Sequence, residues 1–206
     1  MSEDASTRGC QKRIYLERFS SENAELVLAW RNAQHVRENS LNDEAIEHQN
    51  HLRFVENLKS STDRNFFIVH ISDYPVGVLN VNVSDSIGYW GCYLGGAGNG
   101  SARPGLFSIL IGLAGVIAFQ ILDCDKLNSD VVKHNVAPQR MNSFLNIPIV
   151  GHREEKRPSG EHIEVINFSL KRQAWPAVLC RLKSTLTTSD RKLLEAFSQS
   201  PIISEV

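Results

Sequence analysis

The spacing of apolar side chains predicts a succession of strands and helices joined by short connections. Strict alternation over residues 13–19 predicts a half-buried strand, and apolar stretches between turn residues predict further strands. Ile46, Val55 and Leu58 recur at helical spacing, which predicts an amphipathic helix. The predicted strands cover residues 13–19, 65–71, 76–84, 87–94, 126–132, 148–157 and 162–173. The predicted helices cover residues 21–30, 43–61, 107–122 and 136–146, with one more through Phe197 capped by Ser189.

The order of these elements predicts an α+β fold. Strands and helices come in separate groups, apart from one β-α-β crossover within residues 87–132. The helix over 107–122 is apolar on most faces, so we expect it to be buried. Its apolar run is too short, and too interrupted by glycine, to span a bilayer.

Composition and charge narrow the classes of partner. The 206 residues suffice for one domain with an appendage or for a tight pair of domains. A formal net charge of -1 argues against a nucleic-acid or anionic-membrane partner. The four cysteines are far apart and have no zinc-site spacing, so neither a disulfide framework nor a structural metal is expected. Without an apolar signal region, the reducing cytoplasm is the expected location.

A glycine-rich segment, GGAGNGSARPGL at residues 95–106, separates a predicted strand from the apolar helix. Backbone N–H groups at a helix N-terminus bind anions, and glycine lets a phosphate approach them closely. Arg103 adds a positive charge. Ser101 stands where a nucleotide-binding P-loop would need lysine, which argues against an NTPase. The segment is a candidate pyrophosphate site, and a plain surface loop is the alternative reading.

The motifs around this segment resemble the GNAT superfamily of acetyl-CoA-dependent N-acetyltransferases. When the helices are aligned, Leu110 and Ile111 match that family's apolar pair, and Gly105 matches the first glycine of its loop motif. Phe107 replaces the second glycine. Asn135 matches the asparagine that follows the next strand in the family. The resemblance covers about residues 13–175, and residues 176–206 are expected to form a C-terminal tail with one helix.

The N-terminal half narrows the resemblance within that superfamily. The segments LAWRN, IEHQNHLRFVENL and NFFIVHISDYPVGVLNV are similar to a branch containing ribosomal-protein N-terminal acetyltransferases and nucleotide-amino-sugar acetyltransferases of the pseudaminic acid pathway type. WRN at 30–32 and His51 before Phe54 favour the sugar enzymes. The resemblance implies a mixed, mostly antiparallel sheet flanked by helices, with a strand-loop-helix site for CoA.

The resemblance also assigns site residues. Acetyl-CoA is the implied co-substrate, and its binding residues would be Cys92, Tyr93, Leu94, Gly100, Ser101, Arg103, Gly105, Leu106 and Asn135. The acceptor would contact Trp30, Arg31, Asn32 and Trp90, with Arg31 on a nucleotide diphosphate. His51 and Glu164 are candidate bases for the acceptor amine. Asn142 stands where the family often has the tyrosine that protonates the departing thiolate.

Each of these residues also has an ordinary structural reading. His51 could be a half-buried helix histidine, Arg31 a helix-terminal charge, and Trp90 a core aromatic. Glu164 could be an exposed strand carboxylate. His48 and His51 share a helix face but have no convincing third ligand, so no metal is expected. Cys92 has no paired base, so it is expected to be inert.

The sequence therefore predicts an N-acetyltransferase that transfers acetyl from acetyl-CoA to the amine of a nucleotide-linked amino sugar. Acetylation of a protein N-terminus is the same-fold alternative, and a non-catalytic acyl-CoA-binding module is another. The expected partner is a small molecule, with neither nucleic acid nor membrane, and a homodimer is allowed for.

Overall fold

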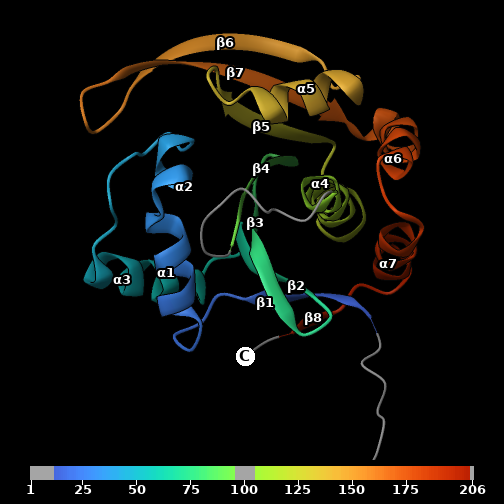
Figure 1. The fold of residues 1–206 in the computed structure, drawn as a ribbon, viewed down its shortest axis with the longest axis horizontal. Helices are drawn as coiled ribbons and strands as arrows, with labels where there is room; N and C mark the ends of the chain where they lie inside the picture. Colours follow the sequence, from blue (N-terminus) through green and yellow to red (C-terminus); the bar gives the residue numbers. More distant parts are fainter. Residues whose placement is uncertain (1–11, 96–104, 205–206) are drawn as a thin grey trace, which may run out of the picture.

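The computed structural model describes residues 12–95 and 105–204 and has the α+β architecture expected from the sequence (Figure 1). Its strands are β1 (Ile14–Arg18), β2 (Arg64–Ile71), β3 (Tyr74–Ser84), β4 (Ile87–Leu94), β5 (Lys126–Val132), β6 (Ile149–Lys156), β7 (His162–Lys171) and β8 (Ile203–Ser204). Its helices are α1 (Ala24–Asn32), α2 (Gln34–Glu38), α3 (His48–Leu58), α4 (Leu106–Val116), α5 (Val136–Phe144), α6 (Trp175–Ser184) and α7 (Thr188–Gln199). A π-helical turn at Ile117–Ile121 extends α4.

The strands form one sheet in the order β6-β7-β5-β4-β3-β2-β1-β8. β4 pairs with β5 in parallel, as a β-α-β crossover through α4 requires, and β1 pairs with β8 in parallel. The other neighbours are antiparallel. The mixed, mostly antiparallel sheet flanked by helices is therefore confirmed.

Helices cover both faces of the sheet, because alternate strand residues are apolar on each face. Phe67 and Val69 of β2 pack into the larger core with α4, α6 and α7. Ile68, between them, points the other way and packs with Val27 of α1 and Val55 of α3. Figure 1 shows α1, α2 and α3 together on one side of the molecule and α4, α6 and α7 on the other.

The residues expected to form a C-terminal tail are part of the larger core in the structure. Trp175, Leu182 and Leu194 of α6 and α7 are buried against α4. A Cβ at Gly115 of α4 would lie 2.2 Å from the Trp175 ring, so glycine is what allows this close packing. The expected cap Ser189 is corrected to Thr187, whose hydroxyl accepts a hydrogen bond from the Asp190 N–H at 3.1 Å.

Two further expectations concern the chain as a whole. Among the described residues, no helix combines the length and the apolarity needed to cross a membrane. The three cysteines within the described ranges, Cys92, Cys124 and Cys180, are free thiols.

Candidate active site

The site begins where β4 and β5 separate. Their parallel ladder runs from the pair Ile87 and Lys126 to the pair Tyr89 and Asn128 and then ends, although both strands continue. β4 thus keeps pairing with β3 on one side as far as Leu94 while its other edge leaves β5. Backbone groups along that edge are free of strand pairing, so an extended ligand can bond them as an added strand would.

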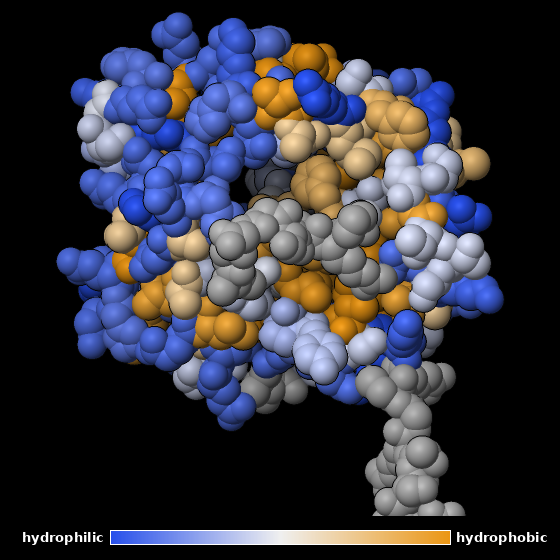
Figure 2. Space-filling view, in the orientation of Figure 1, coloured by the Kyte–Doolittle hydropathy of each residue, from blue (hydrophilic) through white to orange (hydrophobic). Residues whose placement is uncertain are grey.

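A cavity of about 490 Å³ occupies the gap between the two strands. Figure 2 shows the hollow in the face that it displays, between hydrophilic side chains over α2 and more apolar ones toward α4 and α5. Its lining residues include members of α1, the α2–α3 connection, α3, β2, β3, β4, β5, α4 and α5. The cavity therefore has two halves, one bounded by α1 to α3 and one by α4 and α5.

His51 of α3 lies in the first half with its side chain almost fully buried, at 3% exposure. Its Nε2 lies 3.0 Å from the Ala24 carbonyl oxygen, which can only accept, so Nε2 carries the hydrogen. Nδ1 is then the nitrogen that can take up a proton. Burial lowers the pKa of His51, which the Ala24 carbonyl only partly opposes, so the neutral imidazole is favoured.

Arg31 of α1 also lines the first half, close to Tyr93 of β4. Its Nη2 donates to the Asn42 carbonyl at 2.8 Å. Its Nη1 is buried and has no hydrogen-bond partner in the part of the chain that the structure describes. Burial lowers the pKa of Arg31 and raises that of Tyr93. An unpaired buried N–H of a cation is costly, so this site calls for an oxygen acceptor.

The other two residues of the WRN segment have structural roles. A Cβ at Gly95 would lie 2.4 Å from the Trp30 ring, so Trp30 packs directly against the backbone at the end of β4. Asn32 donates to the Ile46 carbonyl at 2.9 Å and accepts from the Ile46 N–H at 2.8 Å. Asn32 thereby fixes the connection between α2 and α3, and Ile46 of that connection lines the cavity.

Phenylalanines form much of the remaining wall of the first half. Phe54 of α3 meets Phe66 of β2 edge to face, with ring centroids 5.1 Å apart, and Phe19 packs on Phe66 at 5.5 Å. All three line the cavity together with Asn80 of β3. A Cβ at Gly91 would lie 3.0 Å from Asn80 Oδ1, so this amide lies across the backbone of β4. The first half can therefore hold a ligand with both apolar and polar groups.

The second half contains two residues expected to hold the cofactor, Cys92 and Asn135, together with Trp90, expected at the acceptor, and Asn142, expected at the thiolate. It is lined by Trp90 and Cys92 of β4, by Phe107 of α4, by Asn142 of α5 and by Asn135 directly before α5. Tyr93 lines the cavity from the first half, whereas Leu94 packs into the core beside it. Asn142 is buried, at 3% exposure. Desolvation raises the pKa of Cys92 to about 12, so its thiol stays protonated at neutral pH.

The structure describes the N-terminus of α4 from Gly105 onward, and an anion site there stays a prediction. Gly105 has φ +85°, a left-handed conformation that side-chain-bearing residues rarely adopt. Its carbonyl accepts from the Ile109 N–H at 3.0 Å, which starts the helix, and Leu106 is buried behind it. The predicted residues Gly100, Ser101 and Arg103 lie outside the described residues.

Glu164 is the one predicted base that the structure does not bring to the cavity lining. It lies on β7, forms an ion pair with Lys133 and accepts from His152 Nδ1 at 3.0 Å. These partners, with Lys133 the strongest, lower the pKa of Glu164. A carboxylate held in this way is a weak base, and a role for Glu164 in the reaction stays a prediction.

His48 and His51 do not converge on a common point. His48 pairs with the exposed Glu25, while His51 is turned to the Ala24 carbonyl. Within the described ranges, no group of three or more His, Cys, Asp or Glu side chains is placed to hold a metal ion.

Three kinds of lining residue were not predicted from the sequence. Asn80 and Asp130 are polar residues inside strands, and the phenylalanines look like ordinary core residues. Asp130 is held by Arg153 at 2.6 Å and Asn167 at 2.7 Å. The α2–α3 connection includes residues 43–47, which the sequence predicted as the start of a helix that begins only at His48 in the structure. For Asn80, the only sequence signal is a polar side chain within an apolar strand, which the structure pairs on both sides.

Comparisons with known proteins agree with this architecture. No protein-family profile matches the chain. Acetyltransferase PseH of Campylobacter jejuni is 27% identical over 121 residues, which is 57% of this chain and 71% of PseH. The crystal structure of that PseH with acetyl coenzyme A matches with a TM-score of 0.56 and 22% identity, covering 77% of this chain and 99% of the other.

A second solved structure extends the likeness beyond PseH. Spermidine N-acetyltransferase from Vibrio cholerae, solved with CoA and spermine, matches with a TM-score of 0.70 and 12% identity. The match covers 80% of this chain and 98% of the other. The relative and these structural neighbours are acetyltransferases, as the sequence motifs predicted. The chain therefore has the fold of the GNAT superfamily of N-acetyltransferases.

Proposed function

We propose that the protein transfers an acetyl group from acetyl-CoA to the amine of a nucleotide-linked amino sugar. The second half of the cavity would take the thioester end of acetyl-CoA, and the first half would take the sugar and its diphosphate. The similarity to PseH supports an amino sugar as the acceptor.

The observation that carries this proposal is the unpaired guanidinium nitrogen of Arg31. Its Nη1 is buried without a partner in the described ranges and belongs to a residue that lines the first half. A phosphate oxygen would satisfy that donor with a charge-assisted hydrogen bond once the guanidinium turns toward the cavity. A simple polyamine carries only positive charge and would be repelled by Arg31. An acceptor with both an amine and an anionic group fits a cavity that contains His51 as a candidate base and Arg31 as a cation.

The residues present fit acetyl-CoA. The edge of β4 beyond Tyr89 is free of strand pairing, so it can hydrogen-bond an amide-containing arm. The N-terminus of α4 at Gly105 offers backbone N–H groups to a pyrophosphate. Trp90, Asn135 and Asn142 line the cavity beside this strand edge. Acetyl-CoA, when bound, supplies an acetyl group on a thioester, which is reactive toward a neutral amine.

His51 is the group best placed to keep the acceptor amine neutral. Its Nδ1 can accept a proton because Nε2 donates to Ala24, and burial lowers the His51 pKa so that the basic form is available. The overall change is balanced. One C–N bond forms and one C–S bond breaks, and the sulfur leaves as a thiolate. His51 receives the amine proton and releases it to water, and the thiolate takes one proton from water, so no net proton is lost or gained.

Asn142 and Cys92 bear on two other steps, the protonation of the departing thiolate and the formation of a covalent acetyl-enzyme. The Asn142 amide can donate a hydrogen bond to a sulfur, but it has no titratable proton to transfer. Cys92, with a pKa of about 12, is not a nucleophile at neutral pH. The acetyl group would therefore pass directly to the amine without a covalent enzyme intermediate.

A CoA-release assay on a matched panel of acceptors tests the proposal. The panel holds nucleotide-linked amino sugars, the same sugars without the nucleotide, spermidine, and peptides with free N-termini. The nucleotide-linked sugars should give the highest kcat/KM, and removing the nucleotide should raise KM. If only peptides are acetylated, the protein is an N-terminal acetyltransferase. If no thioester is consumed although CoA binds, it is an acyl-CoA-binding module.

A further inference from the structure

The wall of the acceptor half includes a segment that has no regular structure of its own. Residues 39–46 connect α2 to α3 and are called the acceptor loop here. Asn39, Ser40, Leu41, Asn42 and Ile46 of this loop line the cavity. A loop without helical or strand pairing must have its polar backbone groups satisfied in another way if it is to keep one conformation.

Arginine side chains hold the carbonyls of this loop and of the residue before it. Arg31 Nη2 donates to the Asn42 carbonyl at 2.8 Å, and Arg37 Nη1 donates to the Asp43 carbonyl at 3.0 Å. Arg157 Nη2 donates to two carbonyls, that of Glu38 at 2.7 Å and that of Ser40 at 2.9 Å. Arg31 and Arg37 lie on α1 and α2, close to the loop in the sequence. Arg157 directly follows β6, 117 positions after Ser40.

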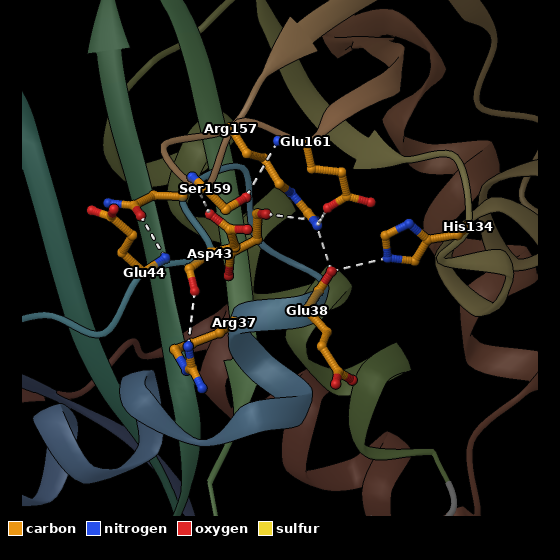
Figure 3. A network of polar contacts seen from close by, with 10 residues as sticks. Arg37, Glu38, Asp43, Glu44, His134, Arg157, Ser159 and Glu161 are labelled. Carbon is orange, nitrogen blue, oxygen red and sulfur yellow. Dashed lines mark hydrogen bonds and ion pairs between the residues drawn. The ribbon is translucent and has the colours of Figure 1, made fainter.

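Arg157 is unusual because its charge is buried. It follows β6, and its side chain is 4% exposed. Its Nη1 pairs with Glu161 Oε2 at 2.6 Å, across the turn between β6 and β7. Burying a guanidinium is costly unless it is paired and hydrogen-bonded. Figure 3 shows how these partners converge on it from the acceptor loop and from the turn.

Two further contacts lie close to Arg157, one at the end of α2 and one within the acceptor loop. His134, just after β5, has Nε2 2.9 Å from the Glu38 carbonyl. Asp43 Oδ1 accepts from the Ser159 N–H at 3.4 Å, and a hydrogen bond from the Ser159 side chain is the main cause of the lowered Asp43 pKa. The β6–β7 turn thus contacts the loop at Asp43, and His134 contacts the last residue of α2, directly before the loop.

We propose that Arg157 is a positioning residue for acceptor binding. It fixes the acceptor loop against the β6–β7 turn, so that Asn39, Ser40 and Asn42 face the cavity in one arrangement before the acceptor arrives. Arg157 is not among the residues that line the cavity, so it acts through the loop. This role rests on the proposed function insofar as the loop binds the acceptor.

The decisive variants are Arg157→Met and a matched control, Arg172→Met. Arg172 makes the same kind of contacts elsewhere: it donates to the Cys124 and Phe119 carbonyls, each at 2.9 Å, and pairs with Asp123 at 2.7 Å. Arg157→Met should raise the acceptor KM by about tenfold or more while the acetyl-CoA KM stays within about twofold. Arg172→Met should leave both KM values near wild type at equal folded fraction.

A second readout does not depend on activity. Hydrogen exchange followed by mass spectrometry reports the opening of the acceptor loop in the protein without substrates. Peptides that cover residues 39–46 should exchange faster in Arg157→Met than in wild type or Arg172→Met. Equal exchange in all three proteins would overturn the positioning role, whatever the substrate proves to be.

His134→Ala covers the case in which Arg157→Met does not fold. His134 is exposed, so its removal should leave the fold intact while the Glu38 carbonyl loses one donor. Its loop peptides should exchange faster, and its acceptor KM should rise by a smaller factor than in Arg157→Met. If neither quantity changes in His134→Ala and Arg157→Met is unfolded, the inference is wrong. If wild type acetylates no nucleotide-linked sugar but the exchange contrast holds, only the proposed function fails.

Discussion

The two halves of the cavity are built on different principles. The half beside α4 and α5 has a main-chain feature, a strand edge released from β5, and α4 itself begins at a left-handed glycine. The half beside α1, α2 and α3 depends on side chains, chiefly His51, Arg31 and the phenylalanines around Phe66. Main-chain features can serve a co-substrate shared by a whole fold, whereas side chains can change with each acceptor. The comparison predicts that variants in the two halves affect different kinetic constants.

The largest effect should come from removing residues 176–206. α6 and α7 bury Leu182, Leu194 and Phe197 against α4, so the deletion exposes the helix that carries the cofactor half. We expect no cooperative unfolding transition in circular dichroism. Trp175→Ala, which only opens the packing on Gly115, should fold with about 3–5 kcal/mol less stability. A truncated protein that unfolds cooperatively would show that these residues are a dispensable tail.

His51→Ala should lower kcat by about 10²–10⁴-fold, the usual contribution of a general base. His48→Ala is the matched control, because His48 lies one turn away, is exposed, and pairs with Glu25. Stopped assays of CoA release give both values. Similar kcat for the two variants would remove His51 from the chemistry and leave water or another group as the base.

The pH profile sharpens the same assignment. The active form of His51 is neutral, and burial lowers its pKa, so activity should fall only as the pH drops below the ordinary value of about 6.5. His51→Ala should lose this acidic limb in kcat/KM. A limb that persists in the variant belongs to a different group.

Arg31→Met should act on acceptor binding alone. Losing a charge-assisted hydrogen bond costs about 1.5–3 kcal/mol, so the acceptor KM should rise about tenfold to a hundredfold, with acetyl-CoA KM nearly unchanged. Arg31→Lys keeps the charge but cannot serve Asn42 and a ligand oxygen together, so its effect should be intermediate. Equal KM changes for both substrates would contradict the division of the cavity.

The smallest effect is expected for Cys92→Ala. With a pKa of about 12, the Cys92 thiol carries no thiolate at neutral pH, so kcat should stay within about twofold of wild type. Mass spectrometry of wild type mixed with acetyl-CoA alone should show no added acetyl group. Loss of activity together with an acetylated Cys92 would replace direct transfer by a covalent route.

The sequence predicted those parts of the molecule that have a local pattern. The apolar run of α4, the alternating strands and the position of Asn135 before α5 all have periodic or motif signals. Arg31 and His51 of the acceptor half were predicted from such signals, whereas Asn80 and Arg157 have none. Asn80 reads as an ordinary strand residue, and Arg157 reads as a charge at a turn until the structure places it under the Glu38 and Ser40 carbonyls. Contacts across 117 or more positions of the chain leave no trace in local spacing.

The central claim is that one cavity holds both substrates at once, each in its own half. Calorimetric titration of a nucleotide-linked amino sugar into the protein saturated with CoA tests this most directly, because CoA lacks the acetyl group and no reaction can occur. The sugar should bind to the CoA complex with a stoichiometry of one and with an affinity close to that for the free protein. If CoA instead competes with the sugar, the two ligands share one half and the account is wrong.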